Sequence, residues 1–94
     1  MSDSDRLPVI CEKVEQSKVP DLDRNKFIVR SDLSVGQLVM TVRERVDLPA
    51  ESAIFLFVNE AVPNNDATMG ELYRQCRDED GFLYVKYSGE NTFG

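Results

Sequence analysis

The chain has 94 residues, of which 41% are hydrophobic and 30% are charged, a balance typical of one soluble globular domain rather than of two domains, a disordered chain or a membrane-spanning one. The net charge of −6 argues against non-specific binding to nucleic acid or anionic lipid. The sequence contains no histidine, which excludes Ser-His-Asp and Cys-His nucleophile pairs and every histidine-containing metal site.

Two strands are predicted near the start of the chain. Residues 7–14 predict a strand. Val9 and Cys11 face one side, and Pro8, which a first or edge strand tolerates, faces the other with Ile10 and Glu12. Residues 17–25 combine a proline with aspartates and predict a loop. Residues 26–30 hold aromatic and β-branched side chains and predict a second strand, which can form a hairpin with the first.

A helix follows these strands. Ser34 and Gln37 stand at the spacing of a capping box, and Pro49 predicts that the helix ends near Asp47. Apolar residues at helical spacing form one stripe, which is expected to face the core. The residues of this stripe are Val35, Leu38, Val39, Val42 and Val46.

The middle of the chain predicts a buried strand and a turn. Residues 54–58 are a continuous apolar run of strand length. Residues 59–66 carry a proline and paired asparagines, which are typical of a turn, and 61–62 offer one short edge pairing.

A second, shorter helix and a last strand complete the pattern. Thr68 and Glu71 form another capping box, and apolar residues continue at helical spacing to Cys76. An Asp-Gly pair at 80–81 ends this region, and residues 82–87 place aromatic side chains at alternate positions of a strand.

The order of these elements predicts an α+β fold of the β-grasp, or ubiquitin-like, type, with four main strands, one crossing helix and one short helix. The single apolar stripe and a right-handed crossover place the main helix across one face of the sheet. A ferredoxin-like split β-α-β arrangement is the rival, but its first strand leads straight into a helix. We expect a short polar segment at 1–6, the domain at 7–87 and a flexible tail at 88–94.

The two cysteines, Cys11 and Cys76, are too few for a structural zinc site made of cysteine alone. Residues 1–6 do not resemble a secretory signal, so we expect reduced thiols in a cytosolic or nuclear protein. Both cysteines are expected to act as small core or half-buried hydrophobic residues, with a redox or catalytic cysteine as the alternative.

Charge is distributed unevenly along the chain. Between residues 24 and 45, five basic and two acidic side chains sum to +3, whereas residues 51–71 hold four acidic side chains and no basic one. A solvated face with ordinary surface pairs is one interpretation. The other is a docking surface for an acidic peptide that adds to a sheet edge.

Five sequence blocks resemble the autophagy-related protein 8 family, the GABARAP and light-chain-three type of ubiquitin-like modifiers. They are P-V-I-C-E-K at 8–13, D-L-x-V-G-Q at 32–37, F-V-N at 57–59, D-G-F-L-Y-V at 80–85 and Y-S-G-E-N-T-F-G at 87–94. The resemblance extends from about residue 6 to the last residue, and it supports the ubiquitin-like fold.

The resemblance implies a modifier of autophagy rather than an enzyme, with no cofactor or metal of its own. Gly94 would be activated by an activating enzyme, passed as a thioester to a conjugating enzyme and joined to phosphatidylethanolamine. A cytoplasmic protein would thus reach autophagosomal membranes through a covalent lipid, and would recruit cargo receptors with acidic-flanked aromatic-x-x-aliphatic motifs. A tail over 88–94 can extend about 24 Å, and a glycine has no side chain to block a narrow channel.

The resemblance also assigns peptide-binding residues around an edge strand at 26–29, with plain core packing as the alternative for each apolar member. The pocket for the aromatic side chain matches Pro8, Ile10, Lys26, Ile28 and Phe82. The pocket for the aliphatic side chain matches Phe27, Val29, Leu33 and Leu38. Electrostatic support is expected from Arg24, Arg30 and Arg45. Neighbouring strand residues point to opposite sides, which explains the two sets, and so small an interface predicts micromolar affinity.

Three features depart from the family pattern. Family members normally carry two helices before the domain, whereas residues 1–6 alone precede Leu7 here, so we expect the part of the aromatic pocket that those helices contribute to be missing. Arg30 stands where proline is usual, and Thr41 where a larger apolar residue often lines the aliphatic pocket. We therefore expect a shallower or more polar aliphatic pocket.

Other functions compete with that of a lipid-conjugated modifier. A peptide-binding adaptor that is never conjugated would not need Gly94, and a modifier of the autophagy-related protein 12 type would be attached to a protein lysine. An enzyme is least favoured, because no acid-base pair is recognisable and the acidic run 78–80 is typical of a solvated turn.

Overall fold

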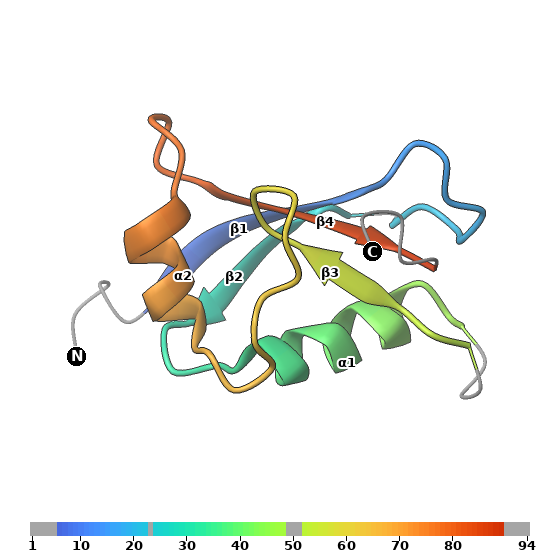
Figure 1. The fold of residues 1–94 in the computed structure, drawn as a ribbon, viewed down its shortest axis with the longest axis horizontal. Helices are drawn as coiled ribbons and strands as arrows, with labels where there is room; N and C mark the ends of the chain where they lie inside the picture. The colour runs from blue at the N-terminus through green and yellow to red at the C-terminus, as the bar shows by residue number, and fades with distance from the viewer. Residues whose placement is uncertain (1–5, 23, 49–51, 90–94) are drawn as a thin grey trace.

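The computed structural model describes residues 6–22, 24–48 and 52–89. These residues form one four-stranded sheet with strand order β2-β1-β4-β3. The two central strands are parallel, and each outer strand is antiparallel to its neighbour. In chain order the elements are β1 (Arg6–Lys13), β2 (Lys26–Arg30), α1 (Val35–Arg45), β3 (Phe55–Phe57), α2 (Met69–Cys76) and β4 (Leu83–Ser88) (Figure 1).

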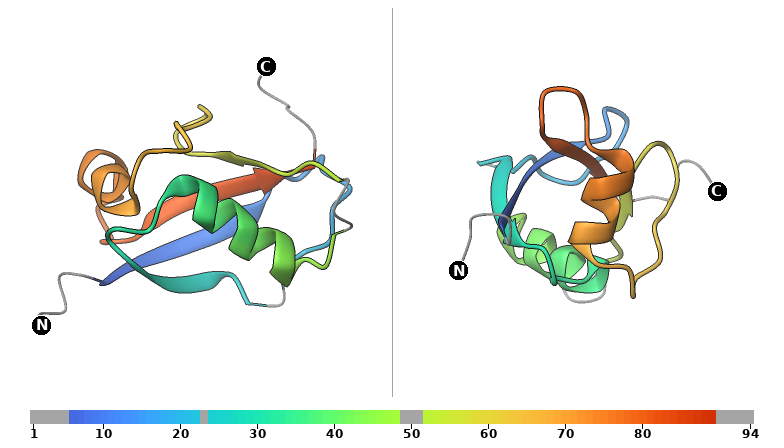
Figure 2. Two further views of the ribbon diagram at one scale, coloured as in Figure 1. Left: turned by 90° about the horizontal axis from the view of Figure 1, so that it is seen from below. Right: turned by 90° about the vertical axis from the view of Figure 1, so that its left-hand side faces the viewer.

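Helix α1 lies across one face of the sheet, and α2 lies at one end of it (Figure 2). We call the face that α1 covers the inner face and the opposite one the outer face. The first strand leads by a loop into a second strand, not into a helix, which separates the fold from the ferredoxin-like rival. The predicted α+β, β-grasp architecture is confirmed.

The core lies between α1 and the inner face. Val35, Leu38 and Val42 of the predicted stripe are buried, whereas Pro8 and Ile10 are half-buried on the outer face. Burial of an apolar side chain of this size stabilises the fold by about 1.5–3 kcal/mol. The sheet contributes the alternate residues Val9, Cys11, Phe27, Val29, Leu83 and Val85.

Both predicted capping boxes are present. The Ser34 hydroxyl accepts a hydrogen bond from the Gln37 amide at 3.1 Å, and the Gln37 side chain accepts one from the Ser34 amide at 3.0 Å. Thr68 and Glu71 make the equivalent pair at 3.2 and 2.9 Å. A cap of this kind contributes about 1 kcal/mol. Helix α1 ends at Arg45, close to the predicted end.

Strand β3 is shorter than the predicted strand at 54–58. Val58 instead forms an isolated bridge with Ala61, so the short edge pairing expected at 61–62 is present at Ala61 but not at Val62. Between them, Asn59 and Glu60 have φ values of 53° and 65°, in the left-handed region. Two left-handed residues in succession reverse the chain, so the regular strand stops before them.

Candidate functional site

Strand β2 forms one edge of the sheet within the described residues. The Cys11 amide donates to the Asn25 carbonyl at 2.8 Å, which places this pair in the hydrogen-bonded set of the β1–β2 ladder. Hydrogen-bonded and non-bonded pairs alternate along an antiparallel ladder, so Pro8 and Ile28 form a non-bonded pair, as a proline without an N–H requires. The backbone N–H and C=O of Ile28 therefore point toward the open edge.

Five of the predicted binding residues come together on the outer face beside this edge. We call them the outer-face patch: Pro8, Ile10, Lys26, Ile28 and Phe82. Pro8 lies opposite Ile28, Ile10 lies opposite Lys26, and Ile28 is 56% exposed. The Lys26 ammonium lies 5.1 Å from the centroid of the Phe82 ring. An apolar surface with a cation at one side is able to hold an aromatic ring.

Most of the second predicted set is buried between α1 and the sheet rather than exposed at the surface. Phe27 and Leu38 are 8% and 1% exposed, Val29 is buried with them, and Leu33 packs against this cluster. The Arg45 guanidinium lies over the Phe27 ring, 5.5 Å from its centroid. The predicted aliphatic pocket is therefore closed in this structure, and entry of a ligand side chain requires local rearrangement. A binding role for these residues stays a prediction.

The positions that depart from the family pattern have local partners. The Thr41 hydroxyl donates to a carbonyl one turn earlier in α1 at 3.1 Å, so its polar group is satisfied within the helix. Arg30 donates to Asp32 at 3.1 Å, and this hydrogen bond is the main cause of a lowered pKa at Asp32. Arg24 and Arg45 are exposed like Arg30, so the three arginines form a basic surface around β2.

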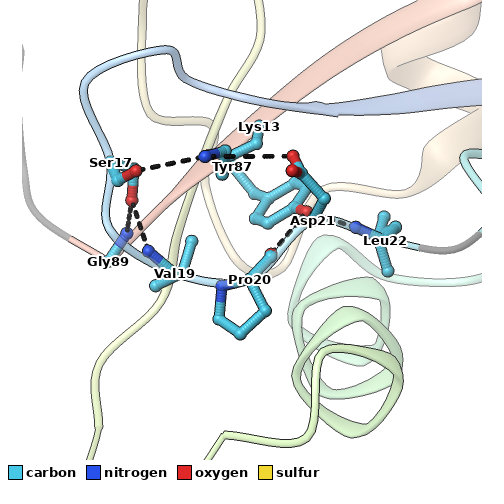
Figure 3. A network of polar contacts seen from close by, with 8 residues as sticks. All are labelled: Lys13, Ser17, Val19, Pro20, Asp21, Leu22, Tyr87 and Gly89. Carbon is cyan, nitrogen blue, oxygen red and sulfur yellow. Dashed lines mark hydrogen bonds and ion pairs between the residues drawn. The ribbon is translucent and has the colours of Figure 1, made fainter.

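A hydrogen-bonded network surrounds the end of β4 (Figure 3). The buried Tyr87 hydroxyl accepts from the Leu22 amide at 2.9 Å and donates to the Pro20 carbonyl at 3.0 Å. The Ser17 hydroxyl oxygen accepts from the Gly89 amide at 3.0 Å. We call this network the tail clasp: Ser17, Pro20, Leu22, Tyr87 and Gly89. The sequence predicts only a loop here, because a tyrosine at an inward strand position does not indicate which backbone groups its hydroxyl reaches.

The ionisable groups with shifted pKa values have local structural causes. Asp80 accepts from the Tyr84 hydroxyl at 2.5 Å, a bond that lowers the pKa of Asp80 and raises that of Tyr84 to about 12. The backbone amide of the α2 cap lowers the pKa of Glu71. Burial raises the pKa of Cys11 to about 12, which makes the thiol unreactive. Cys11 is buried and Cys76 half-buried, as predicted, and both are free.

The described ranges 6–22, 24–48 and 52–89 lack two further features. They contain no group of three or more histidine, cysteine, aspartate or glutamate side chains that would hold a metal ion. They also contain no helix that is both long and apolar enough to cross a bilayer. Gly94, the predicted attachment residue, lies outside the described residues.

Comparison with known proteins places this geometry in a family. Residues 2–94 match the family model described as autophagy protein Atg8, ubiquitin-like. The chain is 58% identical to the autophagy-related protein 8 of Pichia angusta, in a match that covers 96% of this chain and 72% of that protein. It is 57% identical to the autophagy-related protein 8 of Eremothecium gossypii, in a match that covers 95% of this chain and 74% of that protein.

A solved structure agrees with these sequence matches. The crystal structure of Trypanosoma brucei ATG8 is 58% identical in sequence and superposes with a TM-score of 0.88 over 96% of this chain and 78% of that one. The high identity and the shared β-grasp fold lead to the same conclusion. The chain belongs to the Atg8 ubiquitin-like family.

Proposed function

We propose that this chain is a ubiquitin-like modifier of autophagy, conjugated through the carboxylate of Gly94 to the amine of phosphatidylethanolamine. The observation that carries the proposal is the segment Y-S-G-E-N-T-F-G at 87–94, whose first two residues end β4, in a chain of the Atg8 family. On this proposal the chain is the substrate of other enzymes and needs no cofactor or metal of its own.

The conjugation follows ordinary acyl-transfer chemistry. The Gly94 carboxylate attacks ATP in the activating enzyme and releases pyrophosphate, which gives an acyl adenylate. A cysteine thiolate displaces AMP to form a thioester, and this acyl group passes to the conjugating enzyme. The amine of phosphatidylethanolamine then attacks the thioester, so an amide forms and the thiol is released. A glycine at the reacting position leaves space around the carbonyl in each of these sites.

We further propose that the β2 edge binds receptors with an aromatic-x-x-aliphatic motif. A peptide that adds to the edge as a strand would pair with the backbone groups of Ile28, which point outward. Residues i and i+3 of a strand lie on opposite faces, because side chains alternate. The aromatic side chain would therefore meet the outer-face patch, and the aliphatic one would meet Phe27 and Leu33 beside α1.

The basic surface around β2 fits acidic residues that flank such a motif. Arg24, Arg30 and Arg45 are exposed, so they would steer an acidic peptide without paying a large desolvation cost. The small contact area predicts micromolar affinity. The expected partners are thus such receptors and the activating and conjugating enzymes, and the membrane is reached through the attached lipid.

The proposal is tested by reconstitution with matching activating and conjugating enzymes on liposomes that contain phosphatidylethanolamine. The wild-type chain is expected to form a liposome-bound adduct, and Gly94→Ala is expected to form none. An adduct that persists in Gly94→Ala would overturn attachment at this residue.

The same reconstitution separates the alternatives. A chain that forms no adduct but binds the acidic aromatic-x-x-aliphatic peptide at the β2 edge would act as an adaptor. An adduct whose mass corresponds to a lysine isopeptide would identify a protein modifier instead.

A further inference from the structure

We infer that Ser17 and Tyr87 are positioning residues for conjugation, because they fix the point at which the C-terminal tail leaves the sheet. This inference rests on the proposed attachment at Gly94. The tail follows Gly89, and the amide of Gly89 is held by Ser17 of the distant β1–β2 loop (Figure 3). The position of Gly89, the last described residue before the tail, is therefore set by a loop far away in sequence.

Tyr87 holds the loop against β4. Its side chain is fully buried, and its hydroxyl bonds the Leu22 amide and the Pro20 carbonyl, which lie 65 and 67 residues away in the sequence. The Tyr87 carbonyl also accepts from the Val14 amide at 2.9 Å. Both ends of this loop are thus joined to one residue of β4.

Ser17 joins that loop to Gly89, which we call the tail root because the C-terminal tail follows it. It is 5% exposed, and its hydroxyl oxygen accepts from the Gly89 amide at 3.0 Å and from the Val19 amide at 3.4 Å. The Lys13 ammonium donates to the Ser17 carbonyl at 3.3 Å and lies 3.9 Å from Asp21. A buried serine with bonds on both its side chain and its carbonyl has little freedom to move.

Gly89 fits closely against the loop. A Cβ atom at this position would lie 2.6 Å from Cγ1 of Val19, which is shorter than any ordinary carbon–carbon contact. Glycine therefore allows the tail root to approach the loop closely enough for the Ser17 bond. The Ser17 bond and the close contact with Val19 thus involve the same residue, Gly89.

A fixed root matters because the reacting carboxylate lies five residues beyond it. When the tail root is fixed, the Gly94 carboxylate is confined to a smaller volume. Less conformational entropy is then lost when the carboxylate enters an enzyme site. A loosened root should raise the concentration needed for half-saturation and leave the rate at saturation unchanged. The loss of one hydrogen bond predicts a change of about three- to tenfold.

The test compares the wild type with Ser17→Ala, Ser17→Thr and Tyr87→Phe in the reconstituted conjugation described above. Thr68→Ala is the matched control, since it removes a cap worth a similar stabilisation at α2, at the opposite end of the sheet (Figure 1). The measured quantities are the half-saturating concentration of the chain, the rate at saturation, the thermal midpoint and the exchange rate of the Gly89 amide.

We expect Ser17→Ala and Tyr87→Phe to raise the half-saturating concentration about three- to tenfold, and Ser17→Thr, which keeps the hydroxyl, to restore most of the loss. The Gly89 amide should exchange faster in Ser17→Ala by a similar factor, and Thr68→Ala should change neither quantity. If the wild type is conjugated but Ser17→Ala matches it, or Thr68→Ala shows the same shift, the positioning role is wrong. If the wild type forms no adduct, the proposed attachment is wrong and the positioning role falls with it.

Discussion

The β2 edge and the end of β4 differ in how their backbone hydrogen-bonding groups are used. At β2, the ladder register leaves the backbone groups of Ile28 directed outward, beside an apolar side chain that is largely exposed. At the end of β4, Tyr87 is fully buried and Gly89 is bonded to Ser17. The proposed receptor edge thus keeps backbone groups directed outward, whereas the end of β4 has its backbone and side-chain groups bonded within the domain.

The difference has a simple physical origin. An exposed edge retains its binding capacity because its donors and acceptors are not used within the domain. A tail root gains a defined direction when its backbone groups are used, as Ser17 uses the Gly89 amide. Backbone groups that point outward thus mark the proposed receptor site, and backbone groups bonded within the domain mark the proposed exit of the tail.

The largest expected effect is a loss of stability, and it distinguishes a side chain on the inner face from one on the outer face. Leu38→Ala removes a side chain that is 1% exposed and is expected to lower the free energy of unfolding by about 2–5 kcal/mol. Ile28→Ala removes a mostly exposed side chain and should cost less than about 1 kcal/mol, while weakening the binding of an aromatic-x-x-aliphatic peptide. Urea denaturation measures both values. Equal losses of stability would contradict the assignment of Ile28 to an open face.

A proline tests the direction of the edge groups. Ile28→Pro removes an N–H that points away from β1, so the sheet should persist while peptide affinity falls at least about tenfold. Phe27→Pro is the comparison, because its N–H lies within the ladder and its loss should unfold the edge. The measurements are isothermal titration with an acidic-flanked peptide and circular dichroism. Unchanged affinity in a folded Ile28→Pro chain would exclude strand addition at β2.

The pH dependence of stability at alkaline pH tests whether the Cys11 thiol on the inner face is shielded from water. The pKa of Cys11 is raised by burial from 9.0 to about 12, so above pH 9 the unfolded chain loses a proton that the folded chain keeps. The stability from this group is complete below pH 9 and declines from there toward pH 12. Between pH 8 and pH 10, the wild type should lose about 1–2 kcal/mol more than Cys11→Ala. Parallel unfolding free energies for the two chains would show that the thiol is hydrated.

The close contact at the tail root gives the smallest and most specific effect. Gly89→Ala places a Cβ against Val19 and should raise the half-saturating concentration in conjugation about three- to tenfold. Val19→Ala removes the opposing methyl groups, so the double variant should recover most of the loss. Additive effects of the two substitutions would mean that the contact does not set the position of the root.

The sequence was sufficient for features with a local or periodic signal. Both capping boxes were visible as S-x-x-Q and T-x-x-E, and the stripe through Leu38 predicted the buried face of α1. Alternation in 7–14 placed Pro8 and Ile10 together on one side, which is where the outer-face patch lies.

Features that depend on distant contacts were not visible. The bond between Tyr87 and Leu22 joins residues 65 apart, and no spacing rule connects a strand tyrosine to a loop amide. The predicted strand at 54–58 extended too far, because nothing in Asn59 and Glu60 required two successive left-handed residues. The burial of the predicted aliphatic set likewise depends on contacts between β2 and α1, which are distant in the sequence.

Residue-resolved amide exchange on the free chain and on the chain with an acidic-flanked aromatic-x-x-aliphatic peptide tests the contrast between the two regions most directly. Without peptide, the Ile28 amide should exchange near its unprotected rate, whereas the Gly89 and Leu22 amides should be protected. Addition of the peptide should protect Ile28 and leave Gly89 unchanged. A protected Ile28 amide in the free chain, or an unprotected Gly89 amide, would contradict the account.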